Sequence, residues 1–237
     1  MSKTDGYLYV VPTPLSEDVD DFYTVEQKKN VHHIQYFVVE NKKPARNSLK
    51  KLALNTPLQE LKLFENNKNS HLNYEEIIDI LKLGIDVGLI SDCGLPGVAD
   101  PGSELVLKCH FNNIKVKTIA QESSLLSSLA CSGFNGQNFE FVGYLPIDKN
   151  ERKRFISGLT NEIKNLKKTF IFIETPHRNN ETFKFLLESL NPENLVCIAY
   201  DINGHNEFIL TNTIKDWQNK NIQFDKKPCI FLVNQKA

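Results

Sequence analysis

Apolar residues recur along the chain in short runs that are rich in β-branched and aromatic side chains. These runs predict strands at residues 7–11, 34–39, 61–64, 87–91, 114–119, 139–143, 169–174, 195–200, 207–210 and 228–233. Several of the runs are continuously apolar rather than alternating, which is typical of strands that are buried on both faces of a sheet.

Amphipathic segments lie between most of these strands and predict helices. The clearest is residues 73–83, where Asn73 and Glu76 fit an N-cap with a reciprocal glutamate and Gly84 ends the pattern. Four further segments have a helical pattern: residues 102–110, 123–131, 151–164 and 180–190. The alternation of strands and helices predicts an α/β fold with a mainly parallel sheet.

The last third of the chain has a different pattern. The predicted strands at residues 195–200 and 207–210 are joined by the turn-rich sequence INGHN, which indicates a hairpin and therefore a mixed sheet. We place the linker at residues 145–149, where a proline separates a strand from the charged start of a helix. The sequence thus predicts two α/β domains, residues 1–145 and residues 146–237.

Composition and charge narrow the function classes. The chain is 41% hydrophobic and 24% charged, as in ordinary globular proteins, and its net charge of −1 gives no global attraction to nucleic acid or membrane. No apolar run approaches the roughly 20 residues that span a bilayer. The first apolar run is too short for a signal peptide, so we expect a cytoplasmic protein. The five cysteines lack metal-ligand spacing, and no metal site is expected.

Four predicted strands end in segments of unusual composition. These segments are VVPTP (residues 10–14), the loop after LIS (residues 92–102), AQESS (residues 120–124) and IETPHR (residues 173–178). In open α/β sheets, ligands bind beyond the carboxyl ends of the strands. Each segment is therefore a candidate wall of one binding site.

The loop of residues 92–102, here called the glycine-rich loop, contains three glycines together with Asp92 and Asp100. It matches neither the Walker A motif nor GxGxxG, so a phosphate cradle is poorly supported. Two interpretations stay open. The glycines let the backbone approach a flat ligand that the aspartates bind, or the loop is a rigid turn whose aspartates cap backbone N–H groups.

IETPHR and the basic clusters also have two interpretations each. Glu174 is a candidate general base; alternatively, a helix starts at Thr175 and Pro176, and Arg178 pairs with a nearby carboxylate. Basic residues cluster at residues 41–51, 149–154 and 164–168. Such clusters bind phosphate backbones or are simply solvated helix faces, and the second interpretation is the default.

Four motifs together resemble those of class III, S-adenosylmethionine-dependent methyltransferases of the tetrapyrrole methylase superfamily. Within it, the chain is most similar to the ribosomal small-subunit methyltransferase I group, which methylates a cytidine 2′-hydroxyl in 16S rRNA. YLYVVPTP resembles that group's LYIVPTP, and LISDCGLPGVADPG resembles its L-[VI]-S-D-A-G-T-P-x-[IV]-x-D-P-G signature. FVGYLP and FIFIETPHR are similar to its F-x-GFLP and IFYES-[PT]-HR.

The resemblance implies a two-domain tetrapyrrole methylase-like fold, usually a homodimer, that binds S-adenosylmethionine in the cleft between its domains. It places Asp92 at the site and leaves Asp100 to hold the second turn of the glycine-rich loop. The superfamily's cofactor-lining positions correspond to Pro12, Asp92, Cys93, Gly94, Leu95, Val98, Ser123, Ser124, Ile173 and Ala199. A hydroxyl acceptor would need a base, for which the candidates are Glu174, Glu40 and Lys42.

The chain departs from the rRNA group in three segments. The group's GNL becomes SED (residues 16–18), its EDTR becomes ENKK (residues 40–43), and its PGPSA becomes AQESS. The first two belong to the substrate side and the third to the cofactor cleft. Three hypotheses therefore stay open: a methyltransferase that acts on rRNA, one that acts on a tetrapyrrole or other acceptor, and a cofactor-binding protein that has lost catalysis.

Overall fold

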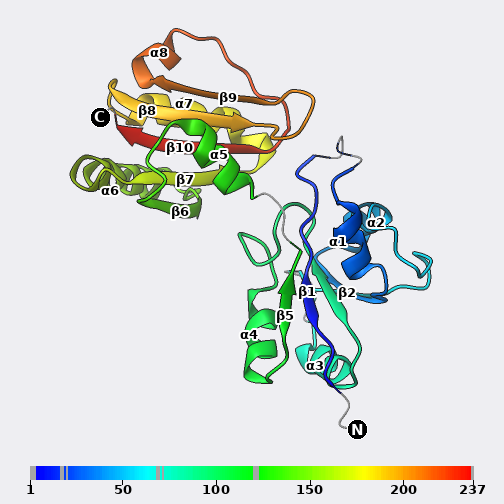
Figure 1. The fold of residues 1–237 in the computed structure, drawn as a ribbon. Helices are drawn as coiled ribbons and strands as arrows, with labels where there is room; N and C mark the ends of the chain where they lie inside the picture. The colour runs from blue at the N-terminus through cyan, green and yellow to red at the C-terminus, as the bar shows by residue number, and fades with distance from the viewer. Residues whose placement is uncertain are drawn as a thin grey trace. The chain divides into compact units, whose positions relative to one another are not determined.

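The computed structural model describes residues 4–16, 19, 21–67, 70, 72–119 and 123–235. The chain forms two compact units, residues 1–121 and residues 122–237 (Figure 1). Parts of two departing segments, residues 17–18 and 120–122, lie outside the described residues. Among the helices of the described residues, none is long and apolar enough to cross a membrane.

The first unit contains a five-stranded sheet of order β3-β2-β4-β1-β5, in which all neighbouring strands are parallel. Its strands are β1 (Leu8–Val10), β2 (Tyr36–Val39), β3 (Lys62–Glu65), β4 (Val87–Ile90) and β5 (Val116–Thr118). Helices α1 (Val25–Val31) and α2 (Lys42–Lys50) cover one face, and α3 (Tyr74–Lys82) and α4 (Ser103–Phe111) cover the other. Burial on both faces explains the continuously apolar strands.

The second unit contains a mixed five-stranded sheet of order β6-β7-β10-β8-β9, in which β6 and β7 are parallel and the other pairs antiparallel. Its strands are β6 (Phe139–Tyr144), β7 (Thr169–Glu174), β8 (Asn194–Tyr200), β9 (Phe208–Thr213) and β10 (Cys229–Gln235). Its helices are α5 (Ser124–Ser132), α6 (Lys149–Leu166), α7 (Asn179–Ser189), α8 (Ile214–Gln218) and the 3₁₀ turn η1 (Pro176–Arg178). Helices α6, α7 and α8 share one core with the sheet, around the fully buried Trp217.

The hydrophobic pattern predicts most of these elements correctly. Every predicted strand is present, the first sheet is parallel, the second is mixed, and β8 and β9 form the expected hairpin. The pattern predicts α3 to α7 but not α1, α2 or α8. The pattern does not predict α2 because only two of its residues, Ala45 and Leu49, are buried, and its sequence therefore lacks an apolar stripe.

The division into units differs from the boundary that the sequence predicts after residue 145. The structure divides the chain between residues 121 and 122. The difference arises because β6 pairs with β7 and α5 packs against β8, β9 and β10. The proline-containing segment after β6 therefore connects two elements of the second unit.

Gly88 at the centre of the first sheet allows a stability prediction. A Cβ atom at this position would fall on the ring of Phe37, which is fully buried. We expect Gly88→Ala to lower the free energy of unfolding by about 1–3 kcal/mol through overpacking. Gly158 in α6 is the matched control, because its Cβ would meet nothing within 4 Å. Gly158→Ala should stabilise by about 0.5–1 kcal/mol; equal effects in urea unfolding of the two variants would contradict this packing.

Candidate functional site

A row of polar contacts joins the carboxyl ends of the strands of the first sheet, in the order of the strands. Asn67, after β3, donates from Nδ2 to Oδ1 of Asn41, after β2, at 3.1 Å. Asn41 donates to the carboxylate of Asp92, after β4, from its backbone N–H at 3.1 Å and from Nδ2 at 2.7 Å. Gly94 and Thr13, which follows β1, exchange backbone hydrogen bonds of 2.8 and 3.2 Å. Four neighbouring strands are thus tied together at the edge where α/β sheets bind ligands.

The glycine-rich loop is held in a conformation that its glycines permit. Gly94 has φ of 84° and Gly97 has φ of 80°, values that residues with side chains rarely adopt. The structure shows the features of the rigid-turn interpretation, because Asp92 accepts a backbone N–H, and the binding of a ligand by the loop stays a prediction. The loop is a fixed turn, and one of its aspartates is aimed along the strand ends by Asn41.

Three carboxylates gather at this loop: Asp92 and Asp100 of the loop itself, and Glu40, which follows β2. The backbone N–H of Asp92 donates to Oε2 of Glu40 at 3.3 Å. Besides burial, the negative charges of Glu40 and Asp92 both raise the pKa of Asp100. Burial, followed by the charge of Glu40, raises the pKa of Asp100 to about 6, although a hydrogen bond with Ser91 acts in the opposite direction. Among the described residues, no group of His, Cys, Asp and Glu side chains is arranged to hold a metal ion.

Asp100 therefore lies close enough to Glu40 and Asp92 for their charges to act on it, and the role that the resemblance implies for it, holding the second turn of the loop, stays a prediction. Carboxyl groups with raised pKa values are common at functional sites, because ligand binding and catalysis use such environments. The sequence indicates the proximity of Glu40 and Asp100 only indirectly. Glu40 follows β2, Asp100 lies in the loop after β4, and these two strands are neighbours in the sheet.

Cys93 is a wall of the site rather than a nucleophile. Although much of the residue is exposed, desolvation by the surrounding chain raises the pKa of its thiol to about 11. The charges of Asp100, Asp92 and Glu40 act in the same direction. The thiol is therefore protonated at neutral pH, and only a thiolate is strongly nucleophilic.

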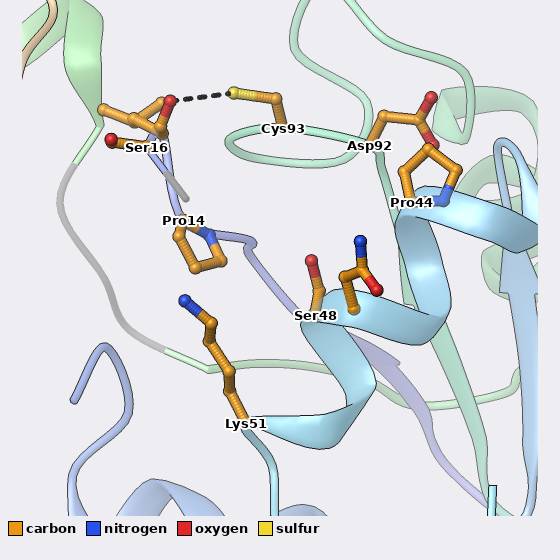
Figure 2. A pocket seen from close by; sticks show the side chains of 9 residues that line it. Pro14, Ser16, Pro44, Ser48, Lys51, Asp92 and Cys93 are labelled. Atoms are coloured by element: carbon orange, nitrogen blue, oxygen red, sulfur yellow. Dashed lines mark hydrogen bonds between the residues drawn. The ribbon is translucent and has the colours of Figure 1, made fainter. Parts of the chain in front are cut away.

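A pocket of about 400 Å³ opens between the glycine-rich loop, the segment after β1 and helix α2 (Figure 2). It is lined by Pro14, Leu15, Ser16, Pro44, Asn47, Ser48, Lys51, Asp92 and Cys93. Helix α2 contributes Pro44, Asn47 and Ser48, whose spacing puts them on one side of the helix. The pocket has the size of a small-ligand site.

The remaining predicted cofactor positions are in the second unit. Ile173 on β7 and Ala199 on β8 are both in register with Ile230 of β10, so the three side chains share one row on one face of the sheet. Ser123 is the N-cap residue of α5 and Ser124 its first residue. Of the other six positions, Pro12 directly precedes Thr13, and Asp92, Cys93, Gly94, Leu95 and Val98 belong to the glycine-rich loop. All ten assignments stay predictions.

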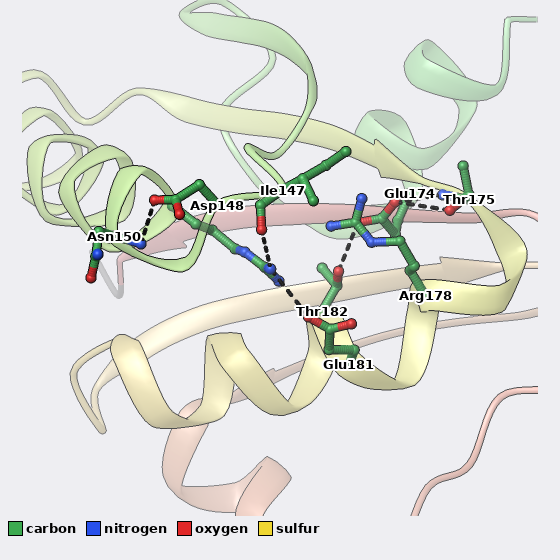
Figure 3. A network of polar contacts seen from close by, with 9 residues as sticks. Ile147, Asp148, Asn150, Glu174, Thr175, Arg178, Glu181 and Thr182 are labelled. Carbon is green, nitrogen blue, oxygen red and sulfur yellow. Dashed lines mark hydrogen bonds and ion pairs between the residues drawn. The ribbon is translucent and has the colours of Figure 1, made fainter.

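Glu174 has a structural environment. Its side chain has 0% exposure, and Nη2 of Arg178 lies 3.2 Å from its Oε2 (Figure 3). Oε2 also accepts from Oγ1 of Thr182 at 2.8 Å, and Oε1 accepts from the backbone N–H of Thr175 at 2.7 Å. The turn η1 begins at Pro176. The structural interpretation of IETPHR therefore describes what is seen, and the catalytic role of Glu174 stays a prediction.

Similarity to known proteins extends along nearly the whole chain, although no protein-family model matches it. The ribosomal RNA small subunit methyltransferase I of Buchnera aphidicola subsp. Schizaphis graminum is 32% identical over 98% of this chain and 79% of that protein. The protein of the same name from Thermotoga maritima is 32% identical over 86% of each chain. The chain belongs to this family. It is a methyltransferase, as the motifs predict.

Solved structures of tetrapyrrole methyltransferases confirm the expected fold of this family member. The methyltransferase CobJ aligns with a TM-score of 0.61 over 98% of this chain and 95% of that chain. Its sequence identity is only 16%, so the likeness concerns the fold alone.

Glu40 and Lys42, the other candidate bases of this methyltransferase, have different surroundings. Lys42 donates its backbone N–H to Oε1 of Glu65 at 3.1 Å, and its Nζ lies 3.5 Å from Oε2 of the same residue. An ammonium group in an ion pair donates protons and has no lone pair that accepts one. Glu40 lies beside Asp92 and the glycine-rich loop. Of the three candidates, Glu40 is the one that the structure places at the row of strand ends.

The raised pKa of Asp100 predicts how stability changes with pH. A carboxyl whose pKa rises from 3.8 to about 6 on folding binds its proton more tightly in the folded state. Its contribution to stability is therefore present below about pH 4 and is lost as the pH rises through 6. We expect Asp100→Asn to stabilise the protein by on the order of 1 kcal/mol at about pH 7.5, and by little at about pH 4.

Urea unfolding at the two pH values measures this difference. Asp79→Asn, at an exposed position on α3, is the control and should show no such gain. An Asp100→Asn variant that is no more stable than the wild type at the higher pH would contradict the clustering of the three carboxylates.

Proposed function

We propose that this methyltransferase transfers a methyl group from S-adenosylmethionine to RNA of the small ribosomal subunit, at a ribose 2′-hydroxyl. The observation that carries the proposal is the 32% identity to ribosomal RNA small subunit methyltransferase I over 98% of the chain. A cytoplasmic location, expected from the sequence, and a homodimeric state, implied by the resemblance, are part of this proposal.

The chemistry of the glycine-rich loop fits S-adenosylmethionine, which would supply an activated methyl group on a positively charged sulfur. Glu40, Asp92 and Asp100 place negative charge beside the loop, which favours a cationic ligand over a neutral one. Glycines at positive φ let the main chain approach a flat adenosine. The two hydrogen bonds from Asn41 fix the orientation of Asp92 before any ligand binds.

The residues of the chain have two tasks in such a reaction. The first is alignment: the tied strand ends hold the walls of the pocket in place, which reduces the entropy lost in reaching a reactive geometry. The second is removal of the proton of a weakly acidic hydroxyl, for which Glu40 is the base that we favour. Glu174 would then act through structure, by holding the turn that follows β7.

Transfer of a labelled methyl group tests the proposed acceptor. The protein is incubated with labelled S-adenosylmethionine and small ribosomal subunits and, in parallel, with tetrapyrroles. We expect label in the RNA, at a linkage that has become resistant to alkali because its 2′-oxygen is methylated. Label in the tetrapyrrole would show another acceptor, which the SED and ENKK departures would then explain. Cofactor binding without transfer to either would indicate loss of catalysis.

Asp92 provides a direct test of the cofactor site. We expect Asp92→Ala to weaken the binding of S-adenosylmethionine at least about tenfold, which corresponds to about 1.4 kcal/mol. The physical reason is the loss of an oriented carboxylate at the start of the loop. Calorimetry measures the affinity, and Asp79→Ala on the exposed side of α3 is the control. Unchanged affinity in the Asp92 variant would show that the loop is not the cofactor site.

A further inference from the structure

The three basic clusters of the sequence differ once the chain is folded. At the start of α6, Arg152 is only 2% exposed and pairs with Glu181 at 3.1 Å. Just after the end of α6, Lys168 pairs with Glu140 at 2.9 Å and with Glu162 at 3.0 Å. Arg152 and Lys168 thus serve the packing of the second unit, whereas Lys149, Lys153 and Arg154 stay exposed.

Helix α2, which holds the remaining cluster, differs because its exposed cations lie beside a pocket of the first unit. Lys43, Arg46 and Lys50 are exposed and spaced so that they form one stripe along the helix, here called the α2 stripe. Within the part of the chain that the structure describes, these three side chains form no ion pair. Lys42, which pairs with Glu65 at 3.5 Å, is not part of the stripe. The α2 stripe therefore keeps its full positive charge toward solvent.

The α2 stripe borders the pocket. Pro44 and Asn47, which line the pocket, directly follow Lys43 and Arg46 of the stripe in the sequence. Consecutive residues of a helix point about 100° apart, so the stripe and the pocket wall are adjacent sides of α2. Asp92, at the start of the glycine-rich loop, also lines the pocket and lies beside Pro44 (Figure 2). A chain of phosphates along the stripe would thus run beside the predicted cofactor loop.

We propose that the α2 stripe is the surface on which the RNA acceptor docks, with its backbone phosphates on Lys43, Arg46 and Lys50 and its strand along the rim of the pocket. This inference rests on the proposed function and adds the surface that holds the substrate. Arginine presents a planar fork of donors to a phosphate, and lysine presents a mobile point charge. Such contacts position a nucleic acid without reading its sequence. The three cations lie beside the pocket and do not line it, so the pocket stays open for the group that reacts.

Salt-dependent RNA binding tests the proposal. The variant K43Q/R46Q/K50Q is compared with the wild type, in full-length form, for binding to a fluorescent fragment of small-subunit rRNA. We expect at least about tenfold weaker binding at roughly 0.1 M salt. The slope of log affinity against log salt should become less steep by about 2, because three phosphate contacts to a single strand are lost. Affinity for S-adenosylmethionine should be unchanged, since none of the three residues lines the pocket.

The variant K149Q/K153Q/R154Q is the matched control, because it removes three exposed cations from α6. It should bind RNA like the wild type. Three results would each overturn the proposal. The two triple variants lose RNA affinity equally, the α2 variant binds RNA as tightly as the wild type, or the wild type binds no RNA. If the wild type fails to methylate rRNA but its RNA binding depends on the α2 stripe, the proposed acceptor is wrong while the docking surface stands.

Discussion

The pair of hydrogen bonds from Asn41 to Asp92 is the contact on which the arrangement of the first unit's site depends. β4 is the central strand of its sheet, and the loop that leaves it begins with Asp92. By binding both oxygens of this carboxylate, Asn41 fixes the start of the loop relative to β2. Glu40 then lies against the backbone of Asp92, which brings its charge close to Asp100. The raised pKa of Asp100 follows from this proximity and from burial.

Three carboxylates in one place are unfavourable for folding unless something offsets their repulsion. A ligand with a positive charge does so, and it would bind more tightly for the same reason. The acidic cluster and the α2 stripe together give the first unit two local fields of opposite sign, although the net charge of the chain is only −1. The cluster suits a cationic cofactor, and the stripe suits an anionic polymer. Because both are close to solvent, the Debye length of about 8 Å at physiological salt keeps the two fields local.

The sequence predicts those features that depend on local pattern. Continuous apolar runs identify the strands, and the spacing of glycines and aspartates identifies the glycine-rich loop before any fold is known. It fails for features that depend on distant contacts. Helix α2 buries only two residues, so its own hydrophobic pattern does not predict a helix. Its position depends on the packing of these two residues against the sheet. The enclosure of Glu174 depends on Thr182, which comes from the next helix, and no local pattern shows that contact.

The ENKK segment shows how a departure from a motif is compatible with the same substrate. The rRNA group has Asp, Thr and Arg where this chain has Asn41, Lys42 and Lys43. An aspartate at position 41 would add a fourth carboxylate and remove the side-chain donor that Asp92 uses here, whereas Asn41 supplies it. Lys42 pairs with Glu65, and Lys43, at the position of the group's arginine, keeps a positive charge at the start of the α2 stripe. In this chain Asn41 therefore supplies the donor to Asp92, and Lys43 keeps the positive charge on which the proposed docking of RNA depends.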